Sequence, residues 1–321
     1  MLTNDYGKYP GFGMNVVIKH PNKNSLDTYL EKLVLLKVEW VRLELNFYDP
    51  ISKELNLYFL EKLKNENIKI LGLLTGLVPG TFINCVYPAL NFKNPLEVLD
   101  SYLEFCRSSV KDYKDFIHVW EIWNEANTLR FWIHKPNHAD YYRLAKASSE
   151  VIREIDPDAK LVLGGIMGED IHVYAPYQTV NFLKDQIEFG IDKFIDFYNI
   201  HPYIPACYFS RKPLDHYLTN VKANISSYLD KYKDVTKPTW ITEFGICPLW
   251  TTLGASQTAV AYRELYKFSI EKKIPFFLWT LTDFQGKEYS RFNPETAFGL
   301  LNWELDEKEI FKCIIAEFSK E

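Results

Sequence analysis

The chain has 321 residues, enough for one large α/β domain or two small ones. Hydrophobic residues make up 47% and charged residues 25%, which is typical of globular proteins and excludes disordered and fibrous classes. The net charge of −5, without a concentrated basic stretch, argues against a nucleic-acid partner. Apolar runs are shorter than the roughly 20 residues that span a bilayer, and residues 1–13 do not resemble a signal peptide. We therefore expect no membrane partner and a cytoplasmic protein, or a secreted one whose signal was removed.

The cysteines and histidines predict neither a disulfide framework nor a metal site. The five cysteines are odd in number and form no CxxC pair. Residues 134–138, HKPNH, space two histidines by four, but Pro136 would break a helix that aligned them, and HExxH is absent. The sequence therefore predicts no metal and no cofactor.

Apolar runs rich in β-branched and aromatic residues recur along the chain, separated by amphipathic stretches. They predict strands over residues 13–18, 39–45, 68–74, 118–124, 160–166, 196–202, 238–244 and 275–281. Helical spacing of apolar residues predicts helices over 25–36, 94–106, 142–155, 218–232 and 307–318. In the second of these helices, Asn94 is the expected cap and Pro95 the first helical residue.

Eight nearly continuous hydrophobic strands, each followed by a helix, are typical of a parallel barrel. The prediction is an α/β protein, a single (β/α)8 TIM barrel over residues 1–321 without an accessory domain. An open doubly wound sheet is the alternative, but no GxGxxG opens a helix. Residues 163–168, LGGIMG, fit a tight turn at a strand tip better.

Functional side chains of such a barrel lie where strands end. Glu125 follows Asn124 at the end of the fourth predicted strand, and Glu243 lies at the end of the seventh. Two carboxylates that flank one bond are what glycoside hydrolysis requires, one protonated and one ionised. Further polar and aromatic candidates at strand ends are Arg42, His201, Tyr203 and Trp279.

The motifs EIWNEAN (121–127), WITEFG (240–245), VRLEL (41–45), IHPY (200–203), FLWTLTDF (277–284) and FGLLN (298–302) stand in one order along the chain. In this set the chain resembles clan A of the glycoside hydrolases, and its ExWNExN form is most similar to glycoside hydrolase family 39. Ala126 replaces the usual proline of that motif.

The resemblance implies a retaining β-glycosidase that acts on carbohydrate by double displacement. It makes Glu125 the general acid/base and Glu243 the nucleophile. It also implies that Asn124 contacts the sugar, that Arg42 and Tyr203 bracket Glu243, and that His201 and Trp279 line the subsite.

Several alternatives stay open at this point. Arg42 could instead form a buried structural ion pair with Glu44 or Glu121. A transglycosylase would share every residue named, and a weakly catalytic carbohydrate-binding barrel is a further possibility. Aromatic residues in loops would either stack on sugars or pack the loops down, and these are Phe82, Tyr87, Phe92, Trp132 and Trp250.

Overall fold

The computed structural model describes residues 12–76, 95–129, 131–132, 136–168, 181–203, 213–232, 237–249, 251–284 and 296–320. By their contacts the residues form two compact units. The first unit comprises Met1–Val41, Pro202–Val235 and Thr239–Glu321, and the second unit comprises Arg42–His201 and Thr236–Pro238.

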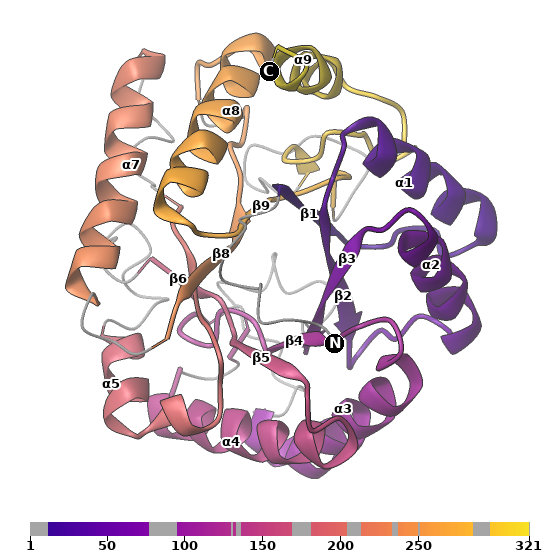
Figure 1. Ribbon diagram of the computed structural model, residues 1–321, viewed down its shortest axis with the longest axis vertical. Coiled ribbons are helices and arrows are strands. Elements are labelled where there is room, and N and C mark those ends of the chain that lie inside the picture. Colours follow the sequence, from indigo (N-terminus) through magenta and orange to yellow (C-terminus); the bar gives the residue numbers. More distant parts are fainter. Residues whose placement is uncertain are drawn as a thin grey trace. The chain divides into compact units, whose positions relative to one another are not determined.

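The first unit is built on three parallel strands. β9 (Phe276–Leu278) pairs with β1 (Phe12–Val16) on one side and with β8 (Thr239–Phe244) on the other. Its helices are α1 (Lys23–Leu35), α7 (Leu214–Lys231), α8 (Ala255–Lys272) and α9 (Glu309–Phe318), and α8 packs beside α9 (Figure 1). The rings of Trp240 and Phe277 stack in its core. A Cβ atom on Gly13 would lie 2.3 Å from the Phe277 ring, so a larger residue at position 13 would clash with it.

The second unit repeats the strand–helix alternation. β2 (Trp40–Asn46), β3 (Lys69–Thr75), β4 (Val119–Ile122) and β5 (Lys160–Leu163) are neighbours in that order, and β6 (Ile166–Met167) pairs with β7 (Tyr198–His201). The boundary between the units falls inside β2. Helical segments of this unit are α2 (Lys53–Asn65), η3 (Pro95–Val98), α3 (Leu99–Tyr113), α4 (His138–Ile155), α5 (Phe182–Glu188) and η5 (Ile191–Lys193).

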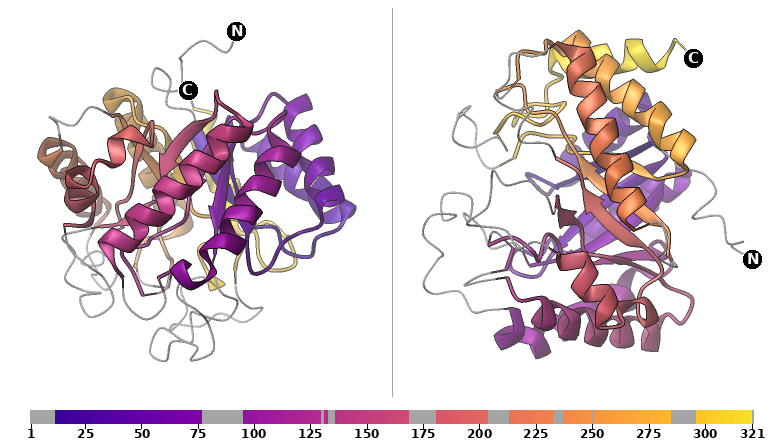
Figure 2. Two further views of the ribbon diagram at one scale, coloured as in Figure 1. Left: turned by 90° about the horizontal axis from the view of Figure 1, so that it is seen from below. Right: turned by 90° about the vertical axis from the view of Figure 1, so that its left-hand side faces the viewer.

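Buried aromatic side chains fix α3 and α4 to the strands of the second unit. The two helices pack side by side (Figure 2). The Tyr102 hydroxyl of α3 donates to Leu74 O at 2.8 Å, and the Tyr141 hydroxyl of α4 donates to Ile122 O at 3.0 Å. Burial raises the pKa of Tyr141 above its ordinary value, so this hydroxyl stays protonated and also accepts from Gly164 N. The end of β4 is therefore tied to both α4 and the chain after β5.

All eight predicted strands are present, with one difference. The predicted strand 160–166 is interrupted at Gly164 and Gly165, which separate β5 from β6. A Cβ atom on Gly164 would lie 2.6 Å from Ile122 O, and one on Gly165 would lie 1.9 Å from His201 Nε2. The interruption thus lets the backbone pass close to β4 and β7.

The predicted helices 25–36, 142–155, 218–232 and 307–318 correspond to α1, α4, α7 and α9. The start of the helix predicted over 94–106 is different, because Pro95 opens the 3-10 turn η3 and α3 begins only at Leu99. Val98 precedes α3 without a side-chain cap, and Asn94 lies outside the described residues.

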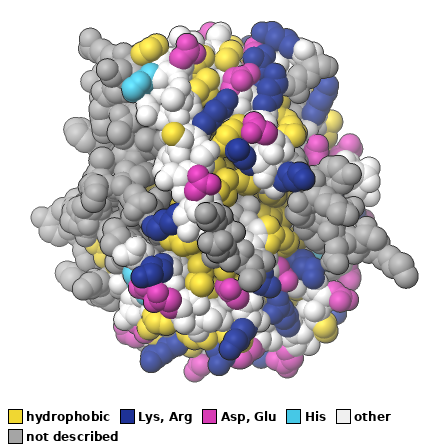
Figure 3. Space-filling model, turned by 60° about the vertical axis from the view of Figure 1, so that its left-hand side comes forward, with side chains coloured by type: hydrophobic (Ala, Val, Ile, Leu, Met, Phe, Trp, Pro, Cys, Tyr) yellow, Lys and Arg dark blue, Asp and Glu magenta, His cyan; other side chains and the backbone are white. Residues whose placement is uncertain are grey.

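Among the described residues, no helix is both long and apolar enough to cross a membrane. On the face drawn in Figure 3, Lys and Arg side chains are interspersed with Asp and Glu. This distribution agrees with the weak net charge of the sequence.

Candidate active site

The backbone at the end of β4 is strained on both sides of Asn124. Trp123 has φ 65° and Glu125 has φ 39°, in the left-handed region that side-chain-bearing residues seldom adopt. Such conformations cost on the order of 1–3 kcal/mol each and persist only where surrounding contacts impose them. Glu125 N donates to Gly165 O at 2.8 Å, and Thr128 donates through both N and Oγ1 to Glu125 O. These contacts set the direction of the Glu125 side chain.

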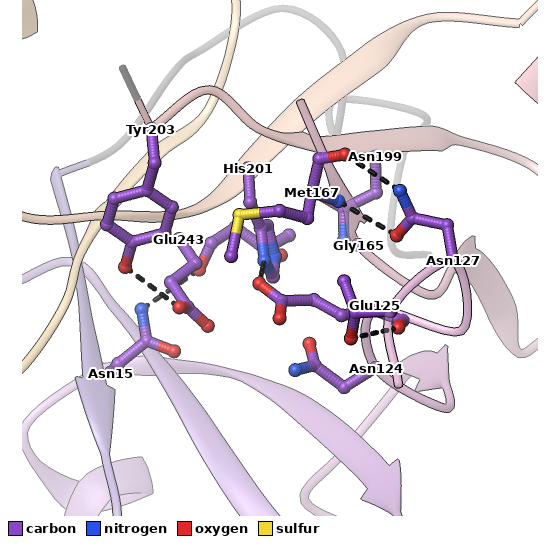
Figure 4. Close-up of polar contacts among 12 residues, drawn as sticks. Asn15, Asn124, Glu125, Asn127, Gly165, Met167, Asn199, His201, Tyr203 and Glu243 are labelled. Atoms are coloured by element: carbon purple, nitrogen blue, oxygen red, sulfur yellow. Dashed lines mark hydrogen bonds and ion pairs between the residues drawn. The ribbon is translucent and has the colours of Figure 1, made fainter. Parts of the chain in front are cut away.

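The Glu125 carboxylate faces His201 of β7, as Figure 4 shows. Its Oε1 lies 2.9 Å from His201 Nδ1, and both side chains are buried. The histidine ring lies directly over Gly165, the one residue type that leaves room for it there. A carboxyl group and an imidazole at this distance can share one proton, which suits a group that must give and take a proton in turn.

A second buried carboxylate, Glu121 in β4, organises the polar side chains of this unit. Arg42 of β2 donates to it twice, from Nε at 2.7 Å and from Nη2 at 2.8 Å. Gly165 N and Asn199 Nδ2 donate to the same carboxylate at 3.1 and 3.0 Å. Both members of the ion pair are essentially inaccessible to solvent, with side-chain exposures of 1% and 0%. The ion pair between Arg42 and Glu121, one of the alternatives left open by the sequence, is therefore present.

The same arginine orients Asn124. Arg42 Nη2 donates to Asn124 Oδ1 at 2.7 Å, so the amide oxygen faces the guanidinium group and the Nδ2 donor faces away. On the other side of the glutamate, Asn127 exchanges two hydrogen bonds with the backbone of Met167, at 2.8 and 3.1 Å. The segment that carries Glu125 is thus fixed to β2 through Asn124 and to β6 through Asn127.

Glu243 belongs to the first unit and lies one residue before the end of β8. The Tyr203 hydroxyl donates to its Oε1 at 2.8 Å (Figure 4). The Tyr203 ring stacks on Phe244, with centroids 6.0 Å apart. Asn15 of β1 ties the neighbouring strands together, because its Nδ2 donates to Thr242 O and to Leu278 O. A phenolic donor stabilises the ionised form of a carboxylate, which is the form a nucleophile needs.

Two of the predicted tryptophans, Trp279 and Trp132, lie within the described residues. Trp279 follows β9, is 8% exposed, and contacts Phe284 edge to face. Trp132 is fully buried between Trp123 and Tyr141, so it packs the loop down and does not line a cleft. The other loop candidates, Phe82, Tyr87, Phe92 and Trp250, lie outside the described residues.

Sequence reasoning missed the parts of the site that hold the named residues. It left Glu121 out of the site and did not single out Asn15, Asn127 or Asn199. The available signal for Glu121 was its place inside an otherwise apolar predicted strand, because a buried charge requires a partner.

The model of the cellulase family, glycosyl hydrolase family 5, matches residues 94–285, which is more than half of the chain. None of the curated proteins matches the sequence.

Solved structures resemble the chain over nearly its whole length. An exo-β-1,4-mannosidase from Opitutaceae bacterium strain TAV5 has a TM-score of 0.66 at 14% identity, and covers 97% of this chain and 59% of its own. Cel5A from Thermotoga maritima, in complex with mannotriose, has a TM-score of 0.62 at 12% identity, and the match covers 96% of this chain and 97% of Cel5A. A glycoside hydrolase family 39 β-xylosidase from Caulobacter crescentus has a TM-score of 0.61 at 14% identity, and the match covers 98% of this chain and 72% of the xylosidase.

These likenesses show the fold, which is the (β/α)8 barrel of the glycoside hydrolases, and confirm the predicted fold class. The predicted membership of clan A is also confirmed, and the similarity to family 39 is compatible with the match to that family's β-xylosidase. The chain spans 59% of the length of the mannosidase that it resembles. By the match to residues 94–285, the chain belongs to the cellulase family, glycosyl hydrolase family 5.

Proposed function

We propose that this glycosidase cleaves β-linked glycosides with retention of configuration, using Glu125 as general acid/base and Glu243 as nucleophile. One observation carries the proposal. In a member of a glycoside hydrolase family, one buried glutamate lies just after β4 and another lies at the end of β8, and each is hydrogen-bonded to a side chain in or just after β7.

In the first step, Glu243 attacks the anomeric carbon while the bond from that carbon to the leaving oxygen breaks. Glu125 gives its proton to the leaving oxygen. In the second step, Glu125 removes a proton from water, the water oxygen attacks the anomeric carbon, and the bond to Glu243 breaks.

The partners of the two glutamates fit these different duties. Tyr203 donates a hydrogen bond to Glu243 and so favours its anionic form. His201 faces Glu125 at 2.9 Å and can donate to or accept from it, as each step requires.

The other residues either bind the substrate or hold the residues that do. The Nδ2 donor of Asn124, turned away from Arg42, is placed to hold a sugar hydroxyl. Arg42 acts by holding Asn124 and Glu121 in place. To Trp279, which follows β9 and is 8% exposed, we assign the apolar ring face on which a sugar ring stacks.

For the substrate class we propose β-1,4-linked hexosides or xylosides. The similar solved structures include an exo-β-1,4-mannosidase, a Cel5A bound to mannotriose and a β-xylosidase. The test begins with aryl β-mannoside, β-glucoside and β-xyloside and with soluble β-1,4-mannan, β-1,4-glucan and β-1,4-xylan. Proton NMR of the first product formed reports its anomeric configuration, and an α-anomer from a β-glycoside would exclude retention.

The roles of the two glutamates are separated by azide rescue. Glu243→Ala should lose nearly all activity, and azide should restore it with formation of an α-glycosyl azide, because azide then attacks in place of the nucleophile. Glu125→Ala should still react with aryl glycosides whose leaving group needs no proton, and azide should give the β-glycosyl azide. Glu44→Ala is the matched control, a glutamate in β2 that is outside the proposed catalytic pair. Cleavage by Glu243→Ala at the wild-type rate without azide would exclude the assignment.

Transglycosylation remains the second candidate, because the same covalent intermediate can be captured by a sugar hydroxyl in place of water. Adding a cello- or manno-oligosaccharide acceptor to the reaction distinguishes the two, since a transglycosylase would form longer products faster than free sugar. A purely carbohydrate-binding role predicts saturable binding of one of these glycans with no turnover.

A further inference from the structure

A buried ion pair lies after β9, apart from the residues assigned so far. Lys308 Nζ donates to both carboxylate oxygens of Asp283, at 2.9 and 3.1 Å, and to Ala297 O at 3.0 Å. Gly299 N donates to Asp283 Oδ1 at 2.8 Å. Asp283 is only 3% exposed. The pair therefore holds residues 297 and 299 from two directions.

The segment held in this way, residues 296–301, runs against residues 281–283, which follow β9. Asp283 N donates to Leu301 O at 3.0 Å, and Leu301 N donates to Leu281 O at 2.8 Å. A Cβ atom on Gly299 would lie 2.1 Å from Asp283 N, so a glycine is needed for the two backbones to approach this closely. The position of segment 296–301 is thus set by Asp283 and its neighbours.

Segment 296–301 carries Phe298 to the surroundings of Glu243. The Phe298 ring packs edge to face against Tyr203, with centroids 6.1 Å apart. The same ring covers Gly245, where a Cβ atom would lie 2.9 Å from it. Tyr203 donates to Glu243, and Gly245 is two residues further along the chain. Phe298 therefore touches both the donor and the backbone that determine where the Glu243 carboxylate lies.

The ion pair between Asp283 and Lys308 contributes little to the stability of the fold. Burial raises the pKa of Asp283 to about 6 in spite of Lys308, and burial lowers the pKa of Lys308 in spite of Asp283. Both shifts mean that desolvation outweighs the attraction between the charges, and apolar replacements of similar volume are often as stable as a buried pair. What an apolar pair would lack is the directional bonds to Ala297 and Gly299.

We propose that Asp283 and Lys308 are positioning residues for the nucleophile, holding segment 296–301 so that Phe298 keeps Tyr203 and Gly245 in place around Glu243. The inference rests on the proposed function, in which Glu243 is the nucleophile. In this proposal Asp283 and Lys308 act on the glycosylation step through Phe298, Tyr203 and Gly245.

The test measures glycosylation directly, with an activated 2-deoxy-2-fluoro glycoside of the sugar that the wild type hydrolyses. This reagent traps the nucleophile, and its time course gives a maximal inactivation rate and a binding constant. Lys308→Met removes the ammonium group and keeps the chain length, while Asp283→Asn removes the charge and keeps an acceptor for Gly299. Each should lower the maximal rate roughly 10- to 100-fold, the effect expected of a displacement of about 1 Å, with the binding constant changed by less than about 3-fold.

The matched control is Glu317→Gln, which removes the ion pairs of Glu317 with Arg263 of α8 and with Lys320 and does not alter segment 296–301 of the same unit. It should lower the melting temperature and leave the inactivation rate unchanged. Phe298→Leu combined with Asp283→Asn should be no slower than the worse single variant, because the two act along one path. If one variant fails to fold, the other two still decide the matter.

The outcomes separate this inference from the proposed function. If the wild type is not labelled on Glu243, the assignment of the nucleophile fails and the positioning role fails with it. If the wild type is labelled on Glu243 and the folded variants react at the wild-type rate, only the positioning role is overturned. Equal losses in the variants and in Glu317→Gln would assign the ion pair to stability alone.

Discussion

The network around Glu121 predicts a specific imbalance between single and double substitutions. Glu121→Ala removes the carboxylate that faces the Arg42 guanidinium. The arginine side chain is only 1% exposed, so water cannot replace that carboxylate. Gly165 N and Asn199 Nδ2 lose the same acceptor. Replacing both charged residues by methionine removes the two charges together and fills the space with apolar atoms, while Gly165 N and Asn199 Nδ2 lose their acceptor as they do in the single variant.

The expected magnitudes follow from this difference. Breaking a buried pair by removing one partner costs about 3–5 kcal/mol, and each unsatisfied buried donor adds about 1–3 kcal/mol. With Gly165 N counted as the one unsatisfied donor, Glu121→Ala should therefore lose at least about 4 kcal/mol of the roughly 5–15 kcal/mol that stabilises a domain of ordinary stability. The double variant Arg42→Met, Glu121→Met should lose clearly less, because apolar replacements of buried pairs are often neutral.

Urea denaturation followed by tryptophan fluorescence measures these free energies of unfolding, and Trp120 beside Glu121 in β4 is a buried reporter. The control is Glu154→Gln, which breaks the Arg107–Glu154 pair of similar length at 3.0 Å on the surface of the same unit. Its loss should stay below about 1 kcal/mol. A loss in Glu121→Ala as small as in this control would refute the reasoning, and so would a double variant less stable than Glu121→Ala.

Three further predictions concern other parts of the two units. Gly165→Ala should displace the His201 ring, since the new Cβ would lie 1.9 Å from Nε2, and should lower kcat roughly 10- to 100-fold, whereas Gly254→Ala, with nothing within 4 Å, should not. Glu125→Gly should be more stable than Glu125→Ala by about 1 kcal/mol in thermal unfolding, the reverse of the usual order, because φ is 39°. Asp283 has a pKa of about 6 in the folded state against 3.8, so the folded state binds the proton more tightly, and the contribution of this group to the free energy of unfolding should fall by about 2 kcal/mol between pH 4 and pH 6. Asp283→Asn should lack that fall in urea titrations across this range; an identical slope in both proteins would contradict it.

Much of the fold could be predicted because burial on both faces leaves a simple record in the sequence. A parallel strand buried on both sides has few positions for polar residues, so the eight apolar runs stood out. The split between β5 and β6 did not, because Gly164 and Gly165 are required by atoms of β4 and β7, which lie far away in the sequence. The 3-10 start at Pro95 likewise depends on packing that a local capping rule does not contain.

For the site, residue type and strand end were enough to nominate Glu125 and Glu243, and the contacts of His201 and Tyr203 with them lie within single units. The sequence could not decide between partners for Arg42. Glu44 and Glu121 are both charged residues in predicted strands, and the two differ in burial, since Glu121 is fully buried and Glu44 is not. Glu121 accepts four hydrogen bonds, whereas Glu44 is partly exposed and accepts from Asn46.

The two left-handed residues at the end of β4 explain why so much polar structure surrounds one glutamate. Neither Trp123 nor Glu125 would hold its φ in isolation. Trp123 is fixed from both sides, since its backbone N donates to Leu74 O and its ring Nε1 donates to Phe131 O. Glu125 is fixed by Gly165 O. These three hydrogen bonds join the strained turn to three different segments, at Leu74, Phe131 and Gly165. The loss of one bond therefore leaves the other two to hold the backbone. The backbone conformation at Glu125 therefore directs its carboxylate toward His201.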